Sequence, residues 1–290
     1  MIEAAACADQ TESVDTSSRD SQLNRRCALF TLLALTLSIG AGLLAWGPVL
    51  LHATTHNYAD ARPLFGVANG ASAAFSLPML LAGAWGWRAL GRSVWPASLQ
   101  RPWQLYFGCI TLAGGLSAAY HLAPNNFGFL LAQATAAGAF VMLLCGVLAE
   151  RMDARFGTPR ACAAVLATVV LATGVSSLGA AADLRPLLML QLLPVLLIPA
   201  GALSLRGRHT RRADWLLMLS LYALARVFDW GDAAVMRFTG GALSGHALMH
   251  LCLAGVVAWL AYRAGAATAS PVAAESGGLA QASTSLSTSG

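Results

Sequence analysis

The chain has 290 residues, of which 57% are hydrophobic and 11% are charged. Soluble domains have about 45–50% apolar and about 25% charged residues, so the composition excludes an ordinary soluble globule, a disordered chain and a collagen-like chain. The net charge of +5 comes from 18 basic residues, all arginine. In membrane proteins such residues gather in cytoplasmic loops, so the charge does not indicate nucleic-acid binding. The composition predicts an integral membrane protein.

The chain divides into a membrane domain with a polar tail at each end. Residues 1–27 and 264–290 are rich in small and polar residues and predict disordered cytoplasmic tails. Residues 28–263 contain eight apolar segments, and a spanning helix takes about 20 residues. The segments run over 28–51, 69–90, 104–122, 128–149, 161–181, 185–205, 214–230 and 243–263. The predicted fold is all-α, a polytopic bundle of eight transmembrane helices.

The distribution of arginine between alternate loops tests this number. Arg226 lies within the seventh segment, and one side of the predicted bundle holds Arg62, Arg185 and Arg237. The other 14 arginines fall on the opposite side, together with both termini. Arginine-rich loops face the cytoplasm, so both termini are predicted to be cytoplasmic. The first segment is too long for a signal peptide and has no A-x-A site after it, so it is expected to remain as a helix.

Three histidines are predicted to meet near the non-cytoplasmic face. His121 lies at the outer end of the third segment, and His246 and His250 lie in the first two turns of the eighth. The i, i+4 spacing of the latter two puts both imidazoles on one helix face. Three histidines and a water make a catalytic zinc site with an open position, which generates a nucleophile. Packing histidines remain the alternative.

Two further groups of polar residues are candidates. Ser117 lies one turn before His121 and could donate a hydrogen bond to a substrate carbonyl, or bond back to its own helix. Arg226, Asp229 and Asp232 follow an i, i+3, i+6 pattern at the outer end of the seventh segment. They form either an ion pair within the membrane or a set of groups that orients a histidine or water.

The remaining polar features have simpler interpretations. Asp60, in the loop after the first segment, is expected to be solvated. The arginine cluster at 206–212 is expected to set the topology and to lie near anionic lipid headgroups. The six cysteines form no C-x-x-C pair and predict packing residues.

Residues 56–262 resemble the alkaline ceramidase family, most closely its bacterial phytoceramidase-like branch. That family belongs to a wider group of seven-helix, metal-dependent membrane hydrolases. The first predicted helix resembles the extra helix that precedes the seven-helix core in that branch. Four stretches carry the resemblance: N-Y-A-D-A-R-P-L-F-G-V-A-N (57–69), G-G-L-S-A-A-Y-H-L-A-P-N-N (114–126), L-A-E-R (148–151), and Y-A-L-A-R-V-F-D-W-G-D (222–232) leading to S-G-H-A-L-M-H-L (244–251).

The resemblance implies zinc-dependent hydrolysis of the amide bond of a ceramide-like N-acyl lipid, in a bacterial inner membrane with the site on the periplasmic side. It implies zinc ligands at His121, His246 and His250, with Ser117 assisting at the carbonyl. The family carries an aspartate about eleven residues after the first histidine, where this chain has Ala132. Losing a general base costs about 10²–10⁴-fold, and Asp229 or Asp232 could substitute.

Two rival functions follow from the same residues. The first is a catalytically decayed family member that binds metal and lipid without turnover, which Ala132 favours. The second is a membrane transporter, which the clustering of polar residues at one end disfavours. The predicted partners are the bilayer and a lipid substrate, with no nucleic acid and no protein partner.

Overall fold

The computed structural model describes residues 26–27, 29–178 and 182–266. Within them every named element is a helix, and β-structure is confined to two isolated bridges. The predicted all-α class is confirmed for this part of the chain. The predicted disordered tails lie outside the described residues, except for 26–27 and 264–266, which are helical and not disordered.

A helix lies over each of the eight predicted apolar segments, and the described residues add three short helices, η1, η2 and α8. Their bounds are Leu29–Trp46, η1 (Ala53–His56), α2 (Gly70–Leu90), α3 (Ala97–Leu122), α4 (Asn126–Arg151), η2 (Ala154–Gly157), α5 (Pro159–Ser176), α6 (Arg185–Ser204), α7 (Arg212–Trp230), α8 (Asp232–Phe238) and α9 (Gly245–Ala266).

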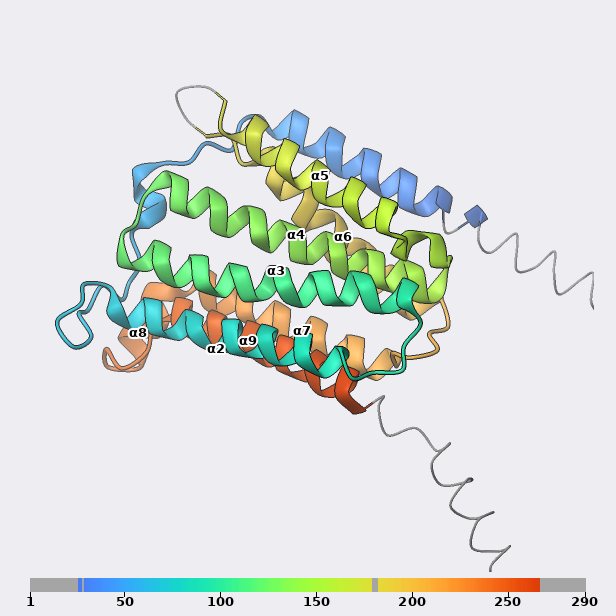
Figure 1. Cartoon of the computed structure of the whole chain (residues 1–290). Helices are drawn as coiled ribbons and strands as arrows, with labels where there is room; N and C mark the ends of the chain where they lie inside the picture. The colour runs from blue at the N-terminus through green and yellow to red at the C-terminus, as the bar shows by residue number, and fades with distance from the viewer. Residues whose placement is uncertain (1–25, 28, 179–181, 267–290) are drawn as a thin grey trace, which may run out of the picture.

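The long helices lie side by side and alternate in direction along the chain (Figure 1). The most extensive contacts join α2 to α3 and α9, α3 to α4, α7 to α9, and α4 to α6. The helix Leu29–Trp46 begins, and α9 ends, at the same end of the bundle. That end is called the arginine end, because it holds Arg151, the loop 206–212 and Arg263. The opposite end, with His121, His246 and His250, is called the histidine end.

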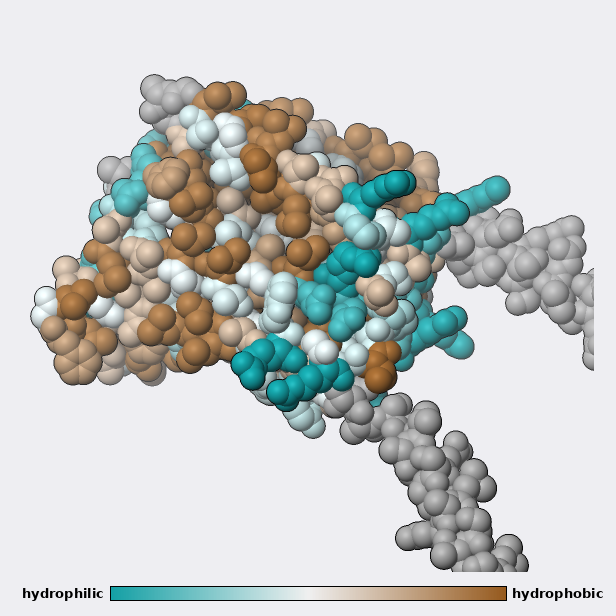
Figure 2. All heavy atoms as spheres, in the orientation of Figure 1, coloured by the Kyte–Doolittle hydropathy of each residue, from teal (hydrophilic) through white to brown (hydrophobic). Residues whose placement is uncertain are grey.

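Among the described residues, six helices are long and apolar enough to cross a membrane: Leu29–Trp46, α3, α4, α5, α6 and α9. These features are those of a multi-pass membrane protein. Hydrophobic side chains cover the middle of the visible face, and hydrophilic ones gather at the arginine end (Figure 2). Many large apolar side chains point outward, among them Phe30, Leu81 and Val170, as expected of helices surrounded by lipid.

The core lies between α2, α3, α4, α6, α7 and α9. Its largest fully buried side chains include Trp103, Phe107 and Trp215. The helix Leu29–Trp46 is peripheral, since none of its apolar window is buried and Leu32 and Leu35 pack against the core. The described cysteines are free thiols, and Cys145 packs in the core.

Several boundaries differ from the sequence-based expectation. The helices over the first and fifth segments end at Trp46 and Ser176, each five residues before the predicted end. The third segment begins at Ala97 and not at 104, because Leu99, Trp103 and Phe107 form a buried stripe at helical spacing. Polar residues between them hide that stripe from a search for apolar runs. The short helix α8 was not expected, and it makes Asp232 the first residue of a new helix and not part of the seventh.

Candidate metal centre

Two helix ends position the three histidines. His121 lies in the last turn of α3, which ends at Leu122 because Pro124 disfavours the helical conformation for the residue before it, Ala123. His246 and His250 lie in the first two turns of α9. The hydroxyl of Ser244 caps that helix by accepting a hydrogen bond from the backbone N–H of Ala247 at 3.1 Å.

The structure brings the three predicted ligands together. The Nε2 atom of His246 lies 3.2 Å from Nε2 of His121 and 3.2 Å from Nε2 of His250. Ligand bonds of about 2.0–2.1 Å in a tetrahedral zinc site place nitrogen atoms about 3.3 Å apart. The three side chains are buried and their ligand atoms fall within 4.8 Å of one another. This cluster could hold a metal ion.

The hydrogen bonding of the ring nitrogens fits the same interpretation. The Nδ1 atom of His246 bonds to Asp229, whereas Nδ1 of His121 and Nδ1 of His250 are buried without a hydrogen-bond partner among the described residues. With a hydrogen on each Nδ1, the three neutral imidazoles would bring their Nε2 lone pairs together at one point. A cation stabilises that arrangement, so the donor set fits a metal.

Asp229 links the histidine cluster to α7. Its Oδ1 atom lies 2.8 Å from Nδ1 of His246, and its Oδ2 atom accepts a hydrogen bond from Arg226. Asp232 accepts hydrogen bonds at 2.8 Å from the backbone N–H groups of His246 and Ala59. Asp229 therefore forms an ion pair with Arg226 and at the same time bonds to a histidine ring. Carboxylates bonded to the far nitrogen of a ligand histidine fix its orientation.

Ser117 lies on the wall of the cavity that the three histidines also line. Its hydroxyl is 3.1 Å from that of Ser76, which bonds to the carbonyl of Ser72 at 3.3 Å. Ser72 in turn donates to the carbonyl of Asp60 at 2.9 Å. Ser117 is thus tied by its hydroxyl to a buried serine chain, and its partner on α2 was not anticipated from the sequence.

A tyrosine from the loop before α2 covers the histidines. The ring of Tyr58 lies 4.3 Å from that of His246 and 4.9 Å from that of His121, measured between centroids. Its hydroxyl donates to the hydroxyl of Tyr120 at 3.2 Å, and His56 bonds to the same oxygen at 2.7 Å. Burial raises the pKa of Tyr58 well above its usual value, so the phenol stays protonated. The sequence gives no periodic signal for a loop contact of this kind.

Asp60 departs from expectation. It is 1% exposed and not solvated, because Arg62 wraps around it with hydrogen bonds of 2.8 Å from Nε and Nη2. The same guanidinium reaches the carbonyls of Gly241 and Ala242 in the connection to α9. The hydrogen bond from Arg62 lowers the pKa of Asp60 below 3.8. The pair joins two loops at the histidine end.

A cavity of about 450 Å³ extends from the histidines into the bundle. Its wall is mainly apolar and reaches Trp215 and Met218 near the start of α7. Ala132 and Gln133 line it from α4, and Gln133 is 3.2 Å from the side-chain amide of Gln191. None of the described α4 residues that line this cavity carries a carboxylate. An apolar cavity of about 300–1,000 Å³ with a few polar groups is typical of a small-molecule site.

The described site therefore consists of a potential metal cluster, an orienting carboxylate, a serine and a covering tyrosine at the mouth of an apolar cavity. In comparisons with known proteins, no family model, no curated protein and no solved structure matches this chain.

Proposed function

We propose that this protein is a zinc-dependent hydrolase of the amide bond of a ceramide-like N-acyl membrane lipid. The observation that carries the proposal is the convergence of His121, His246 and His250 at the mouth of an apolar cavity. An acyl chain fits the chemistry of that cavity wall, and the amide would then lie beside the histidines.

In this proposal His121, His246 and His250 hold the zinc ion, which polarises a carbonyl and activates water when bound. Asp229 holds the imidazole of His246 in orientation through Nδ1. Ser117 releases the hydrogen bond that it gives to Ser76 and donates instead to the amide carbonyl as negative charge develops there. The ring of Tyr58 restricts access of bulk water to the histidines, which strengthens electrostatic interactions at the site.

The proposed setting is a bacterial inner membrane, with eight spanning helices and both termini in the cytoplasm. Support comes from the six apolar helices and from the gathering of arginine at one end. The histidine end then faces the periplasm, and a lipid would enter from the outer leaflet. The charged helix α7 spans because its Arg226 and Asp229 neutralise one another.

A second candidate is a protein that binds metal and lipid without turnover. Ala132 favours it, because that side chain lines the cavity where the resembled family carries an aspartate. In the active alternative, Asp229 or Asp232 accepts the proton. Transport receives less support, since the cavity wall is mainly apolar beyond the histidine end.

The first test is zinc per mole of protein purified in detergent, for the wild type, His121→Ala and His250→Ala. We expect about one zinc ion in the wild type and loss from both variants. His209→Ala, at the arginine end, is the matched control and should retain zinc. No zinc in the wild type, even after reconstitution, would exclude both the hydrolase and the metal-binding alternative.

The second test is release of fatty acid from an N-acyl sphingoid lipid by zinc-loaded protein. Ser117→Ala should lower turnover about 10²–10³-fold and leave the zinc content unchanged. A zinc-loaded wild type without turnover would favour the binding protein over the hydrolase.

A further inference from the structure

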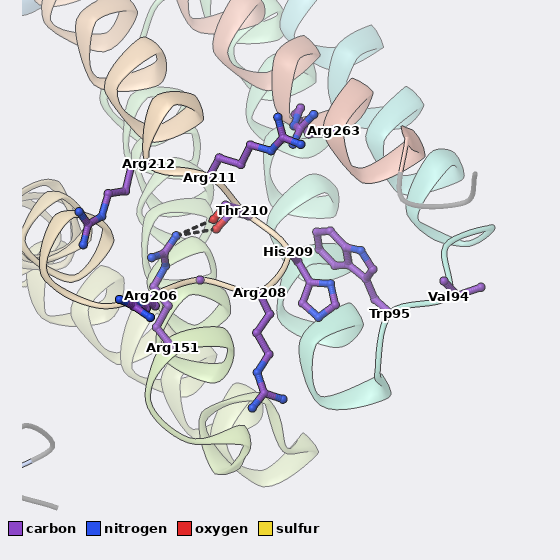
Figure 3. Close-up of a pocket in the computed structure, with 11 residues that line it drawn as sticks. Val94, Trp95, Arg151, Arg206, Arg208, His209, Thr210, Arg211, Arg212 and Arg263 are labelled. Atoms are coloured by element: carbon purple, nitrogen blue, oxygen red, sulfur yellow. Dashed lines mark hydrogen bonds between the residues drawn. The ribbon is translucent and has the colours of Figure 1, made fainter. Parts of the chain in front are cut away.

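The arginine end holds a second pocket, of about 630 Å³, which shares no lining residue with the histidine site. Its wall comes from the connection between α2 and α3, the end of α4, the loop between α6 and α7 and the end of α9 (Figure 3). Six guanidinium groups line it, from Arg151, Arg206, Arg208, Arg211, Arg212 and Arg263. The proposed hydrolase chemistry uses none of them.

Arg151 gives this pocket a fixed wall. Its side chain is 1% exposed and donates hydrogen bonds to the carbonyl of Leu205 at 2.5 Å and to the carbonyl and hydroxyl of Thr210 at 3.0 and 2.9 Å (Figure 3). Glu150 accepts hydrogen bonds from the backbone N–H groups of His209 and Thr210. The loop is therefore held in place from α4, and a pre-organised loop loses less entropy when it binds a ligand.

The pocket carries an excess of positive charge. The nearby carboxylates are already bonded, Glu150 by the loop and Asp214 by the guanidinium of Arg263 at 3.2 Å. Four exposed arginines of the pocket form no ion pair within the described chain: Arg206, Arg208, Arg211 and Arg212. Two carboxylates against six guanidinium groups leave the pocket suited to an anion.

Two buried donors in the wall strengthen this conclusion. The indole N–H of Trp95 and the Nε–H of Arg151 have no hydrogen-bond partner among the described residues. Trp95 is 7% exposed, and its ring packs 5.4 Å from that of His209. A buried donor without an acceptor costs free energy, which a ligand with several acceptor oxygens would offset.

We propose that this arginine pocket binds a phosphate group, supplied by the headgroup of an anionic phospholipid. Guanidinium groups match phosphate oxygens in a bidentate geometry. The pocket belongs to the arginine end, where hydrophilic side chains gather (Figure 2), and the apolar side chain of Val94 in its lining is 73% exposed. A phospholipid whose acyl chains lie along the helices has its headgroup at the height of this pocket. Basic pockets between helices on the cytoplasmic side bind the headgroups of anionic lipids.

The test is calorimetric titration of the full chain in an uncharged detergent with short-chain phosphatidylglycerol, short-chain phosphatidylcholine and inorganic phosphate. The variant Arg206→Gln/Arg208→Gln/Arg212→Gln removes three of the four unpaired charges of the pocket. The matched control Arg88→Gln/Arg92→Gln/Arg160→Gln removes three exposed arginines from the same end that do not line the pocket. Gel filtration and thermal unfolding establish that each variant is folded. If the triple pocket variant does not fold, the single variant Arg208→Gln replaces it in the titration.

We expect phosphatidylglycerol to bind the wild type and the control alike, and the pocket variant about tenfold or more weakly. Binding of inorganic phosphate without phosphatidylglycerol, lost in the pocket variant, would support the phosphate site and assign it to a soluble phosphate compound. Equal weakening in both triple variants would overturn the proposal, because the whole end and not the pocket would then attract the lipid. Equal binding of phosphatidylcholine would overturn it as well.

Discussion

Asp229 on α7 and His246 on α9 are joined by a hydrogen bond of 2.8 Å between Oδ1 and Nδ1. The contact turns Nε2 of His246 toward the other two histidines, and Arg226 holds the second oxygen of the carboxylate. One ion pair therefore neutralises charge within the bundle and sets the direction of an imidazole.

Replacing Asp229 with Asn should weaken zinc binding about 10–100-fold, because the amide orients His246 less firmly than the carboxylate. Competition with a chromogenic chelator measures the zinc affinity. Asp183→Asn is the control. That carboxylate pairs with Arg185 at the start of α6 and does not touch the histidines. Unchanged affinity in Asp229→Asn would assign the ion pair to stability alone.

Gly245→Ala should disrupt the site without removing any ligand. A Cβ atom there would lie 2.0 Å from the carbonyl oxygen of Phe228 and 2.7 Å from Cα of Asp232. The start of α9 must then move away from α7, which costs about 1–3 kcal/mol of unfolding free energy and separates His246 from Asp229.

Gly255→Ala is the matched control for that substitution, since its Cβ would meet nothing within 4 Å on the same helix. Zinc content and the thermal unfolding temperature of the two variants are the measurements. Equal values for both would show that the close approach of α9 to α7 does not position the site.

Ala132→Asp distinguishes a hydrolase that has lost its general base from one in which another carboxylate acts as the general base. If the cavity lacks a proton acceptor, the new carboxylate should raise hydrolysis of an N-acyl sphingoid lipid about 10²–10⁴-fold. Gln133→Asp, one residue along α4, controls for added charge. A wild type that is already active, with no gain in Ala132→Asp, would instead assign the base to Asp229 or Asp232.

The Asp60–Arg62 pair should contribute stability that depends on pH. The pKa of Asp60 is lower in the folded protein than in the unfolded chain. Its contribution to the free energy of unfolding is therefore complete at pH values above the unfolded pKa, and it is lost as the pH falls through the folded pKa. The thermal unfolding temperature of the wild type should therefore fall more steeply below about pH 4 than that of Asp60→Asn.

Arg62→Gln should remove the same pH-dependent component, since it deletes the donor that lowers the pKa. The double variant Asp60→Asn/Arg62→Gln should show no further flattening. Parallel curves for the wild type and Asp60→Asn would contradict a role for this pair in stability.

Apolar segments of spanning length predicted the helices because a helix in lipid must satisfy its own backbone. The i, i+4 spacing of His246 and His250 put both on one face for the same local reason. Because successive helices run in opposite directions, the end of the third segment was predicted to place His121 at the same depth in the membrane as His246 and His250. The start of α3 was missed because buried Leu99 and Trp103 alternate with polar residues.

Composition and apolar segments thus predicted the all-α class, and helical spacing predicted the pairing of His246 with His250, because both depend on residues near one another in sequence. The direction of successive helices predicted that His121, 125 residues from His246, lies beside them. Tertiary structure alone decided the contacts between distant segments. Tyr58 covers His121 and His246, and Ser76 bonds to Ser117, 41 residues away. The burial of Asp60 depends on Arg62, which also spans 179 residues to Gly241. Loop contacts carry no periodicity, so packing of the assembled helices is what defines them.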